Sequence, residues 1–320
     1  MRTVTLTLHP AIDRILEVEK LEPGGTFSTT LLQSVPAGKG VNTARSLSAL
    51  LRPSSIVAAA WIGAGEAAWF ERWLRENNGV RTALYARKNI STRQAYTFME
   101  KSGRETHLKE SMPAPKTKEG AALANLWAKT LLKGDLVAFC GSAPANTPTN
   151  VIAGLLRDAR KRAHRVVADT NGTALESAAR AGLFGIKGNA LEFGELLELG
   201  TPFDLQSASH LKMLRKLRPP VGPEVIVMTM GSRGAAYFTR SDVLFAAPPK
   251  LARSQIKAAT GCGDAATAGW LWAMQEKCSP EETLRRVVAC GTAKLASLDP
   301  GHLDRKLVRQ LVKRVSVKRL

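Results

Sequence analysis

The chain has 320 residues, enough for one large α/β domain or two ordinary ones, and its 44% hydrophobic and 23% charged residues are typical of a globular protein. Lys and Arg number 46 against 27 Asp and Glu, so the formal charge of +19 favours anionic partners, either nucleic acid or phosphorylated metabolites. The four cysteines show no C-x-x-C pair and no histidine at zinc spacing, so they indicate neither a disulfide framework nor a structural metal site, and they fit a reducing cytoplasm.

The N-terminal part of the chain predicts a mixture of strands and helices. Val4, Leu6 and Leu8 alternate as in a strand and do not form the apolar core of a signal peptide. Residues 17–40 contain short alternating segments around a Pro-Gly-Gly turn, which indicates strands and hairpins. The elements expected next are a helix over 42–51, a buried strand over 55–63, a helix over 66–77 and a strand-turn-strand unit over 93–110.

From residue 117 onward, helical and strand patterns alternate regularly. We expect helices over 117–132, 149–163 and 173–181, strands over 135–141, 165–170, 224–231 and 234–240, and further helices after Gly263. Such alternation predicts a doubly wound α/β fold, a mostly parallel sheet with helices on both faces. The hairpin-like stretches 14–35 and 88–110 break the alternation and are expected to pair as a small separate sheet. We therefore expect a single domain over 1–320 with these two insertions.

The basic C-terminal tail, residues 304–320, carries part of the excess positive charge. No aromatic residue for base stacking is interleaved with its cations, so a solvated basic helix is favoured over a nucleic-acid-binding arm. The longest apolar stretch, residues 56–65, is too short and too rich in glycine to span a bilayer. We expect an unexported, cytoplasmic protein without a membrane segment.

The segment Gly261-Cys262-Gly263-Asp264-Ala265-Ala266 satisfies the G-x-G-x-x-G/A pattern of a dinucleotide-binding turn. That fold needs the turn near the start of a βαβ unit and an acidic residue about 20 positions later, at the end of the next strand. Neither condition holds here, and a second match at 63–68 fails in the same way. Both segments are better explained as glycine turns that lead into helices, the first into a helix over about 265–274.

Asp264 follows the glycine turn directly, where backbone donors and the positive end of a helix attract negative charge. One interpretation is an ordinary acidic residue that the helix dipole stabilises. The other is a general base beside an anion hole formed by Gly261, Cys262 and Gly263, which would take a proton from a hydroxyl attacking a phosphoryl group. Local pattern alone leaves both interpretations open.

Further motifs favour the second interpretation: LTLHPAIDRI (6–15), PAGKGVNTARSL (36–47), STRQAYTFME (91–100), DTNGTAL (169–175) and KGNALEFGEL (187–196). With these segments, the chain resembles the PfkB-type, ribokinase-like sugar kinases over residues 1 to about 300, closest to the branch of 1-phosphofructokinase and tagatose-6-phosphate kinase. The resemblance implies a doubly wound α/β fold with a small β-sheet lid made from the two insertions.

The resemblance also implies the substrate contacts. Asp13 and Asn42 match the positions that hydrogen-bond sugar hydroxyls, and the turn from Gly38 to Gly40 matches the place where backbone approaches the sugar. Lys39 and Arg93 match cations near the substrate phosphate. Arg93 also suits this role chemically, because a guanidinium offers a planar fork of donors; the alternative for Arg93 is a solvated charge on a strand.

For the nucleotide, the resemblance implies contacts from Lys187, Asn189, Glu192, Thr229, Gly231 and Gly234. Asn189 and Glu192 form an N-x-x-E element that would organise Mg²⁺ through water, which makes Glu192 the candidate metal contact. The alternative for this element is an ordinary exposed helix start. The turn at Lys39 is not a Walker A loop, because Gly40 follows the lysine where that loop has Ser or Thr.

Several residues depart from the family pattern, namely His9, Ala37, His107, Lys109, Asn146, Gly188, Ala259 and Cys262. The changes at His107 and Lys109 lie in the expected lid and bear on the substrate more than on the chemistry. Cys262 replaces a common alanine inside the expected anion hole. Its thiol is either a partly exposed group with a lowered pKa or, as we favour, a small apolar residue that packs behind the turn.

The implied reaction is transfer of the γ-phosphoryl group of ATP, with Mg²⁺, to a primary hydroxyl of a phosphorylated ketohexose, fructose 1-phosphate in the first instance. The expected partner is a small sugar phosphate, with a homodimer formed through the lid and no membrane or nucleic acid. Two alternatives stay open. One is a kinase of the same fold that phosphorylates an unphosphorylated sugar or a nucleoside, and the other is a basic, nucleic-acid-associated protein that has kept the fold.

Overall fold

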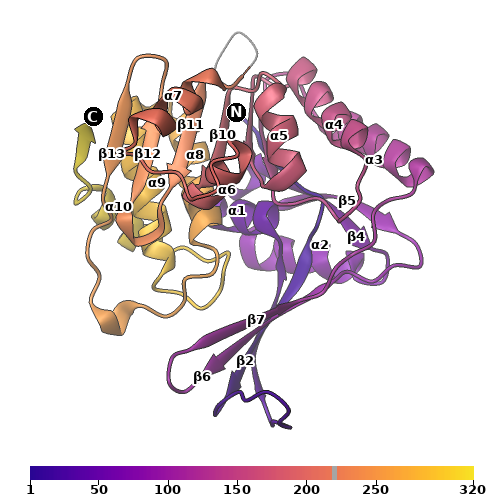
Figure 1. The fold of residues 1–320 in the computed structure, drawn as a ribbon. Helices are drawn as coiled ribbons and strands as arrows, with labels where there is room; N and C mark the ends of the chain where they lie inside the picture. Colours follow the sequence, from indigo (N-terminus) through magenta and orange to yellow (C-terminus); the bar gives the residue numbers. More distant parts are fainter. Residues whose placement is uncertain (218–221) are drawn as a thin grey trace.

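The computed structural model describes residues 1–217 and 222–320 and contains two sheets (Figure 1). The larger sheet has the strand order β14-β13-β12-β11-β10-β9-β8-β1-β4-β5. Neighbouring strands from β5 to β11 are parallel, and the pairs from β11 to β14 are antiparallel. The strands of this sheet are β1 (Thr3–Thr7), β4 (Ile56–Gly63), β5 (Arg81–Arg87), β8 (Leu136–Cys140), β9 (Arg165–Asp169), β10 (Gly185–Asn189), β11 (Val225–Thr229), β12 (Ala235–Phe238), β13 (Val243–Ala246) and β14 (Val317–Arg319).

Helices cover both faces of this sheet, because its strands carry apolar side chains on both sides. One core lies under the helices α1 (Lys39–Ser48), α2 (Ala67–Asn78), α8 (Cys262–Gln275), α9 (Pro280–Lys294) and α10 (Arg305–Val312). The other core lies under α3 (Thr117–Thr130), α4 (Thr149–Arg162), α5 (Gly172–Arg180), α6 (Ala190–Leu196) and α7 (Ala208–Lys216). The predicted doubly wound α/β fold is confirmed.

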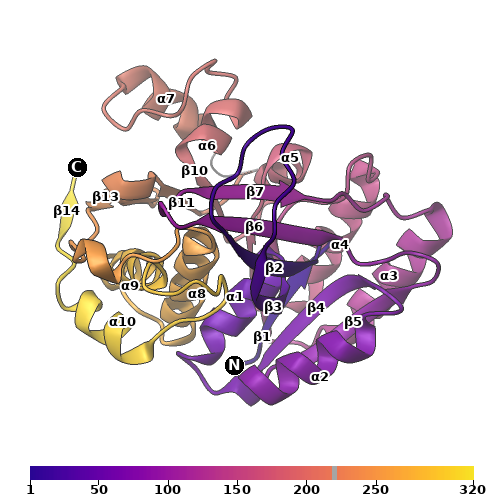
Figure 2. The same cartoon turned by 90° about the horizontal axis from the view of Figure 1, so that it is seen from below.

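The small sheet has the order β3-β2-β6-β7 and projects from one edge of the molecule, as Figure 1 shows at its lower end. Its strands are β2 (Ala11–Val18), β3 (Thr30–Ala37), β6 (Gln94–Glu100) and β7 (Glu105–Lys109). They come from the two stretches that interrupt the βα alternation, so the expected separate sheet is present. Seen from below, the small sheet lies across the space between α1, α8 and the ends of the central strands (Figure 2).

Three element boundaries differ from expectation. Helix α1 begins at Lys39 instead of Asn42, since Gly38 adopts a φ of 112° and its carbonyl accepts the Asn42 N–H at 2.8 Å. Helix α8 begins at Cys262 instead of about residue 265, which places Asp264 in its first turn. The C-terminal tail is not one solvated helix, because α10 is followed by β14, which pairs with β13 and extends the large sheet.

No helix among residues 1–217 and 222–320 is both long enough and apolar enough to cross a membrane. Strands β5, β13 and β14, which the sequence patterns did not predict, occupy the two ends of the large sheet. Edge strands bury fewer side chains than central ones, so their hydrophobic pattern is weaker. The centre of the sheet positions the site. The sequence predicted most of its strands but not β10, which carries Lys187 and Asn189.

Candidate active site

A cavity of about 570 Å³ opens between the carboxyl ends of the central strands, the start of α8 and the inner face of the small sheet. In a doubly wound sheet this is the edge at which ligands bind, and the volume lies in the range of small-molecule sites. The structure brings twelve of the expected site residues to this cavity: Asp13, Gly38, Lys39, Asn42, Arg93, Lys187, Asn189, Glu192, Thr229, Gly261, Gly263 and Asp264. The other four expected residues, Gly40, Cys262, Gly231 and Gly234, do not line it.

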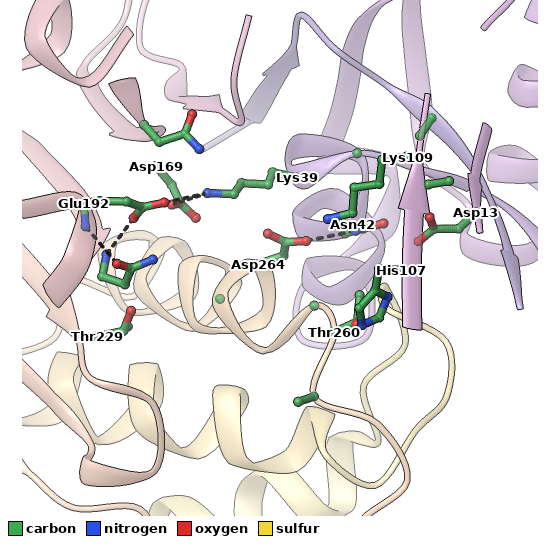
Figure 3. Close-up of a pocket in the computed structure, with 18 of the residues that line it drawn as sticks. Asp13, Lys39, Asn42, His107, Lys109, Asp169, Glu192, Thr229, Thr260 and Asp264 are labelled. Atoms are coloured by element: carbon green, nitrogen blue, oxygen red, sulfur yellow. Dashed lines mark hydrogen bonds and ion pairs between the residues drawn. The ribbon is translucent and has the colours of Figure 1, made fainter. Parts of the chain in front are cut away.

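Asp264 lies at the centre of the cavity, in the first turn of α8, with 6% of its surface exposed (Figure 3). Its Oδ2 accepts a hydrogen bond of 2.9 Å from Nδ2 of Asn42, on α1. Burial, reinforced by the nearby carboxylate of Asp169, raises the pKa of Asp264 to about 6. A carboxylate with this pKa is deprotonated at neutral pH and more basic than an exposed one, as a general base requires.

The turn before Asp264 is built on Gly261, which is the residue before α8 and has a φ of 88°. A Cβ atom at this position would lie 2.3 Å from the carbonyl oxygen of Pro300, so only glycine fits. The turn exposes the start of a 14-residue helix to the cavity, where the dipole favours an anion. Of the amides expected to line an anion hole, that of Cys262 already donates to the carbonyl of Ala259 at 3.2 Å.

Two lysines and two carboxylates form a network on the side of the cavity next to β9 and β10. Nζ of Lys187 donates to Oδ2 of Asp169 at 3.0 Å, and both side chains are buried. Nζ of Lys39 lies 3.7 Å from Oδ1 of Asp169 and 3.6 Å from Oε1 of Glu192. Burial opposes ionisation of Asp169, but Lys187 and Lys39 outweigh it and hold the pKa of Asp169 below its usual range. Lys39 is therefore a cation held in the cavity by two acids.

Asn189 and Glu192 begin helix α6 with a capping box. The Glu192 N–H donates to the Asn189 side chain at 2.9 Å, and the Asn189 N–H donates to Oε2 of Glu192 at 2.7 Å. This capping leaves Oε1 of Glu192 directed toward Lys39 and the cavity (Figure 3). Within residues 1–217 and 222–320, no group of three or more His, Cys, Asp or Glu side chains could hold a metal ion by itself.

The small sheet contributes a second set of charges on the opposite side of Asp264. Figure 3 shows Asp13, His107 and Lys109 on this side, away from Lys39 and Glu192. Burial raises the pKa of Asp13 to about 6, although Lys109 and other cations oppose this rise. Arg93 also lines the cavity, and it donates three hydrogen bonds of 3.1–3.4 Å to the carbonyl oxygens of His9, Pro10 and Glu110.

Comparison with known proteins agrees with this geometry. Residues 5–303 match the pfkB family carbohydrate kinases. The chain belongs to this family. A 1-phosphofructokinase from Bacillus subtilis is 30% identical over 318 residues, which cover 99% of each chain. A tagatose-6-phosphate kinase from Staphylococcus epidermidis is 22% identical over 98% of each chain. The crystal structure of phosphofructokinase-2 from Escherichia coli superposes with a TM-score of 0.87, at 22% identity and 98% coverage of each chain.

As a member of the pfkB family, the protein is an ATP-dependent carbohydrate kinase, and the resemblance stated from its sequence motifs is confirmed. The cavity also contains residues for which the sequence analysis assigned no role. Asp169 is the most important, because it joins Lys39 and Lys187. The available signal was its position as a carboxylate at the end of the buried strand pattern 165–170, the edge where parallel sheets bind ligands. Asn171, directly after the same strand, carried the same signal. Glu105 and Thr260 line the cavity as well and carried no comparable signal.

Two departures from the family pattern have clear structural consequences. Burial raises the pKa of Cys262 to about 11, although Lys294 opposes the rise, which argues against the alternative of a low-pKa thiolate. The favoured interpretation of Cys262 as a packing residue agrees with its absence from the cavity lining. His9 accepts a hydrogen bond of 3.2 Å from the Met112 N–H through Nε2, and burial lowers the pKa of His9 to about 4. His9 is thus a neutral structural acceptor at neutral pH.

Proposed function

We propose that this kinase transfers the γ-phosphoryl group of ATP to the primary C6 hydroxyl of fructose 1-phosphate and forms fructose 1,6-bisphosphate. The observation that carries the proposal is the position of Asp264, a buried carboxylate with a raised pKa between two groups of cations. Lys39 and Lys187 lie on the β9–β10 side, and Lys109 and Arg93 lie on the side of the small sheet. Two separate cationic regions suit a reaction in which both substrates carry phosphate.

In this proposal, Asp264 orients the C6 hydroxyl and accepts its proton as the oxygen attacks the γ-phosphorus. The Asn42 amide fixes the carboxylate through its bond to Oδ2, and the other carboxylate oxygen faces the hydroxyl. The start of α8 and the Lys39 ammonium stabilise the negative charge on the transferred oxygens. The bond from the γ-phosphorus to the bridging oxygen breaks, and ADP leaves with the electron pair.

The nucleotide is assigned to the side of Glu192, Asn189 and Thr229, at the ends of β10 and β11. Mg²⁺ bound with the nucleotide would supply positive charge that offsets the charge of the phosphates. The residues present fit such an ion only indirectly, since the carboxylate oxygens of Glu192 and Asp169 that lie beside Lys39 in the cavity are already paired with its ammonium. Glu192 would therefore contact the ion through water.

The choice of fructose 1-phosphate rests on the names of the relatives. Two relatives that are 30% identical, from Bacillus subtilis and Xanthomonas campestris, are both named 1-phosphofructokinase, and each alignment covers at least 96% of either chain. Lys109 and Arg93 give the sugar end of the cavity the positive charge that a sugar phosphate requires. A cytoplasmic location belongs to the same proposal, supported by four free cysteines.

The direct test is an ADP-release assay with MgATP over matched phosphorylated and unphosphorylated acceptors. We expect the highest kcat/KM with fructose 1-phosphate and much lower values with fructose and nucleosides. Preference for an unphosphorylated sugar or a nucleoside would replace the proposed substrate. Absence of turnover with every acceptor, together with DNA binding that weakens steeply as salt is raised, would instead support the nucleic-acid-associated alternative.

Arg93 is expected to contribute to phosphosugar binding. We predict that Arg93→Ala weakens fructose 1-phosphate binding by about 1.5–3 kcal/mol, the range for hydrogen bonds to charged groups, and leaves the KM for ATP unchanged. The matched control is Arg104→Ala, which removes an exposed arginine from the turn between β6 and β7 of the same sheet, outside the cavity lining. An unchanged KM for fructose 1-phosphate in Arg93→Ala would favour an unphosphorylated substrate.

We also propose that two copies associate through the outer face of the small sheet. Strand register aligns Leu31, Leu16 and Phe98 across this sheet, and Tyr96 with Leu108, all on the face opposite Asp13. Leu31 is 51% exposed and Leu108 is 57% exposed, so the face is apolar and uncovered in one copy.

We expect light scattering to give the mass of a dimer for the wild type and of a monomer for the double variant Leu31→Glu/Leu108→Glu. The control is Leu132→Glu, at an equally exposed leucine after α3. A monomeric wild type, or a dimer that survives the double substitution, would contradict this assembly.

A further inference from the structure

Lys294, the last residue of α9, is a buried cation that the mechanism above does not use. None of its surface is exposed. Its ammonium donates one hydrogen bond, 2.8 Å long, to the carbonyl oxygen of Ser297. An ammonium has three donors, and burial of such a group costs several kcal/mol unless nearby charges or acceptors compensate. A fully buried lysine with a single acceptor among the described residues therefore requires an explanation.

Lys294 lies directly behind the turn that begins α8. Helix α9 packs on α8, and a Cβ atom on Gly291 would lie 3.4 Å from the carbonyl oxygen of Cys262. Lys294 follows Gly291 by three residues and so shares this face of the helix. Consistent with this position, the carboxylates of Asp299, Glu105 and Asp264 act on the charge of Lys294. Burial nevertheless lowers the pKa of Lys294.

The ammonium also holds the loop 295–301 that supports the same turn. The carbonyl of Leu295 accepts the Lys257 N–H at 2.7 Å, just before the turn, and the carbonyl of Pro300 packs against Gly261. Asp299, in the same loop, accepts a hydrogen bond of 2.5 Å from the buried Arg45 of α1. Lys294, through Ser297, thus ties the end of α9 to the backbone on which the Gly261 turn rests.

We propose that Lys294 is a positioning residue for phosphoryl transfer, a cation built into the protein behind the Gly261–Gly263 turn. Its positive charge adds to the field of the α8 N-terminus, and its bond to Ser297 fixes the supporting loop. Both effects favour the transition state, in which negative charge spreads over the transferred oxygens, more than they favour the bound substrates. The inference rests on the proposed kinase reaction at Asp264.

The test compares Lys294→Met, which keeps the length of the side chain and removes its charge, with Lys257→Met, which removes a charge from an exposed side chain nearby. We expect Lys294→Met to fold with an equal or higher Tm, because a buried charge is lost. Its kcat should fall about 10- to 100-fold, at or below the loss seen for a direct anion-hole donor. The KM values for ATP and fructose 1-phosphate should change by less than about twofold, and Lys257→Met should match the wild type.

A second measurement separates an electrostatic role from a structural one. ADP with aluminium fluoride mimics the planar transferred group, and its affinity should fall in Lys294→Met in proportion to kcat while the affinity for ADP alone is unchanged. A wild-type kcat in a folded Lys294→Met protein would overturn this inference and leave the proposed function intact. Failure of both Lys294→Met and Lys294→Gln to fold would also overturn it, since the residue would then be structural. No turnover by the wild type with any sugar would overturn the proposed function itself.

Discussion

Asp264→Asn should lower kcat by about 10²–10⁴-fold, the usual contribution of a positioned general base, without loss of the fold. Asparagine keeps the size of the side chain and an oxygen that can accept the 2.9 Å hydrogen bond from Asn42. It cannot take the proton from the attacking hydroxyl. Rapid-quench or coupled kinetics with fructose 1-phosphate measure the effect, and the affinity for ATP should stay at its wild-type value.

The pH dependence provides the matching control. The pKa of Asp264 is raised to about 6, so the active, deprotonated form is lost as the pH falls through about 6. We therefore expect kcat/KM of the wild type to drop on the acidic limb of its pH profile, where the pH falls through about 6. Asp13 has a pKa raised to a similar value, so the limb reports both acids in the wild type and only Asp13 in Asp264→Asn. A wild-type kcat in Asp264→Asn would remove Asp264 from the role of base.

The contribution of Asp264 to the stability of the fold should depend on pH in the direction opposite to its contribution to activity. A carboxyl group whose pKa is raised in the folded state binds its proton more tightly there than in the unfolded chain, so ionisation costs stability. For Asp264 this cost begins as the pH rises above the unfolded value of about 4 and is complete above about 6. At pH 7.5 the Tm of Asp264→Asn should therefore equal or exceed that of the wild type. A large drop in Tm would show that lost activity reflects a damaged fold.

Gly261→Ala should also lose activity, at least about 10²-fold in kcat, because the anion-binding start of α8 would be displaced. The backbone at Gly261 has a φ of 88°, which costs an alanine about 1–2 kcal/mol. In addition, the new methyl group would lie 2.3 Å from the Pro300 carbonyl oxygen, a contact that forces the loop 295–301 to move. Overpacking of this kind adds about 1–3 kcal/mol to the destabilisation.

Gly134→Ala separates these two effects. Gly134 has a φ of 90°, almost the same as Gly261, and no atom lies within 4 Å of the position that a Cβ would occupy. In urea unfolding, Gly134→Ala should lose only the free energy that the positive φ costs an alanine, about 1–2 kcal/mol. Its kinetics should match those of the wild type. Equal losses of stability in the two variants would contradict the role of Pro300. Wild-type kcat in Gly261→Ala would contradict the importance of the turn for catalysis.

The sequence predicted the fold well where strands are buried on both faces. Continuous apolar runs such as 55–63 and 135–141 predict buried strands, and in the structure they form β4 and β8. Strand β10 was missed although it is buried, because its sequence GIKGN contains two glycines and a lysine and no apolar run. The edge strands β13 and β14 were missed, since their few side chains are buried on one face or not at all. The C-terminal tail was interpreted as a helix because of its charge, but its last residues complete the large sheet instead.

The candidate site was predictable only where a local motif carried the information. The G-x-G-D turn and the N-x-x-E element each fix a helix start, which is a local property of the chain, and the structure has both. The network of Asp169 and Lys187 depends on two neighbouring strands meeting in register, as Lys187 pairs with Asp169 across β9 and β10. No local pattern encodes that meeting. Lys294 was missed for the same reason, because its burial depends on the packing of α9 against α8.

Identification of the product tests the central claim most directly. Fructose 1-phosphate, MgATP and the wild-type protein would be followed together by ³¹P and ¹³C NMR, beside a reaction with Asp264→Asn. The proposed function predicts a new phosphomonoester at C6, formed in equal amount to ADP by the wild type and at least about 10²-fold more slowly by the variant. ADP accompanied only by inorganic phosphate, phosphorylation at another position, or equal rates for the two proteins would contradict it.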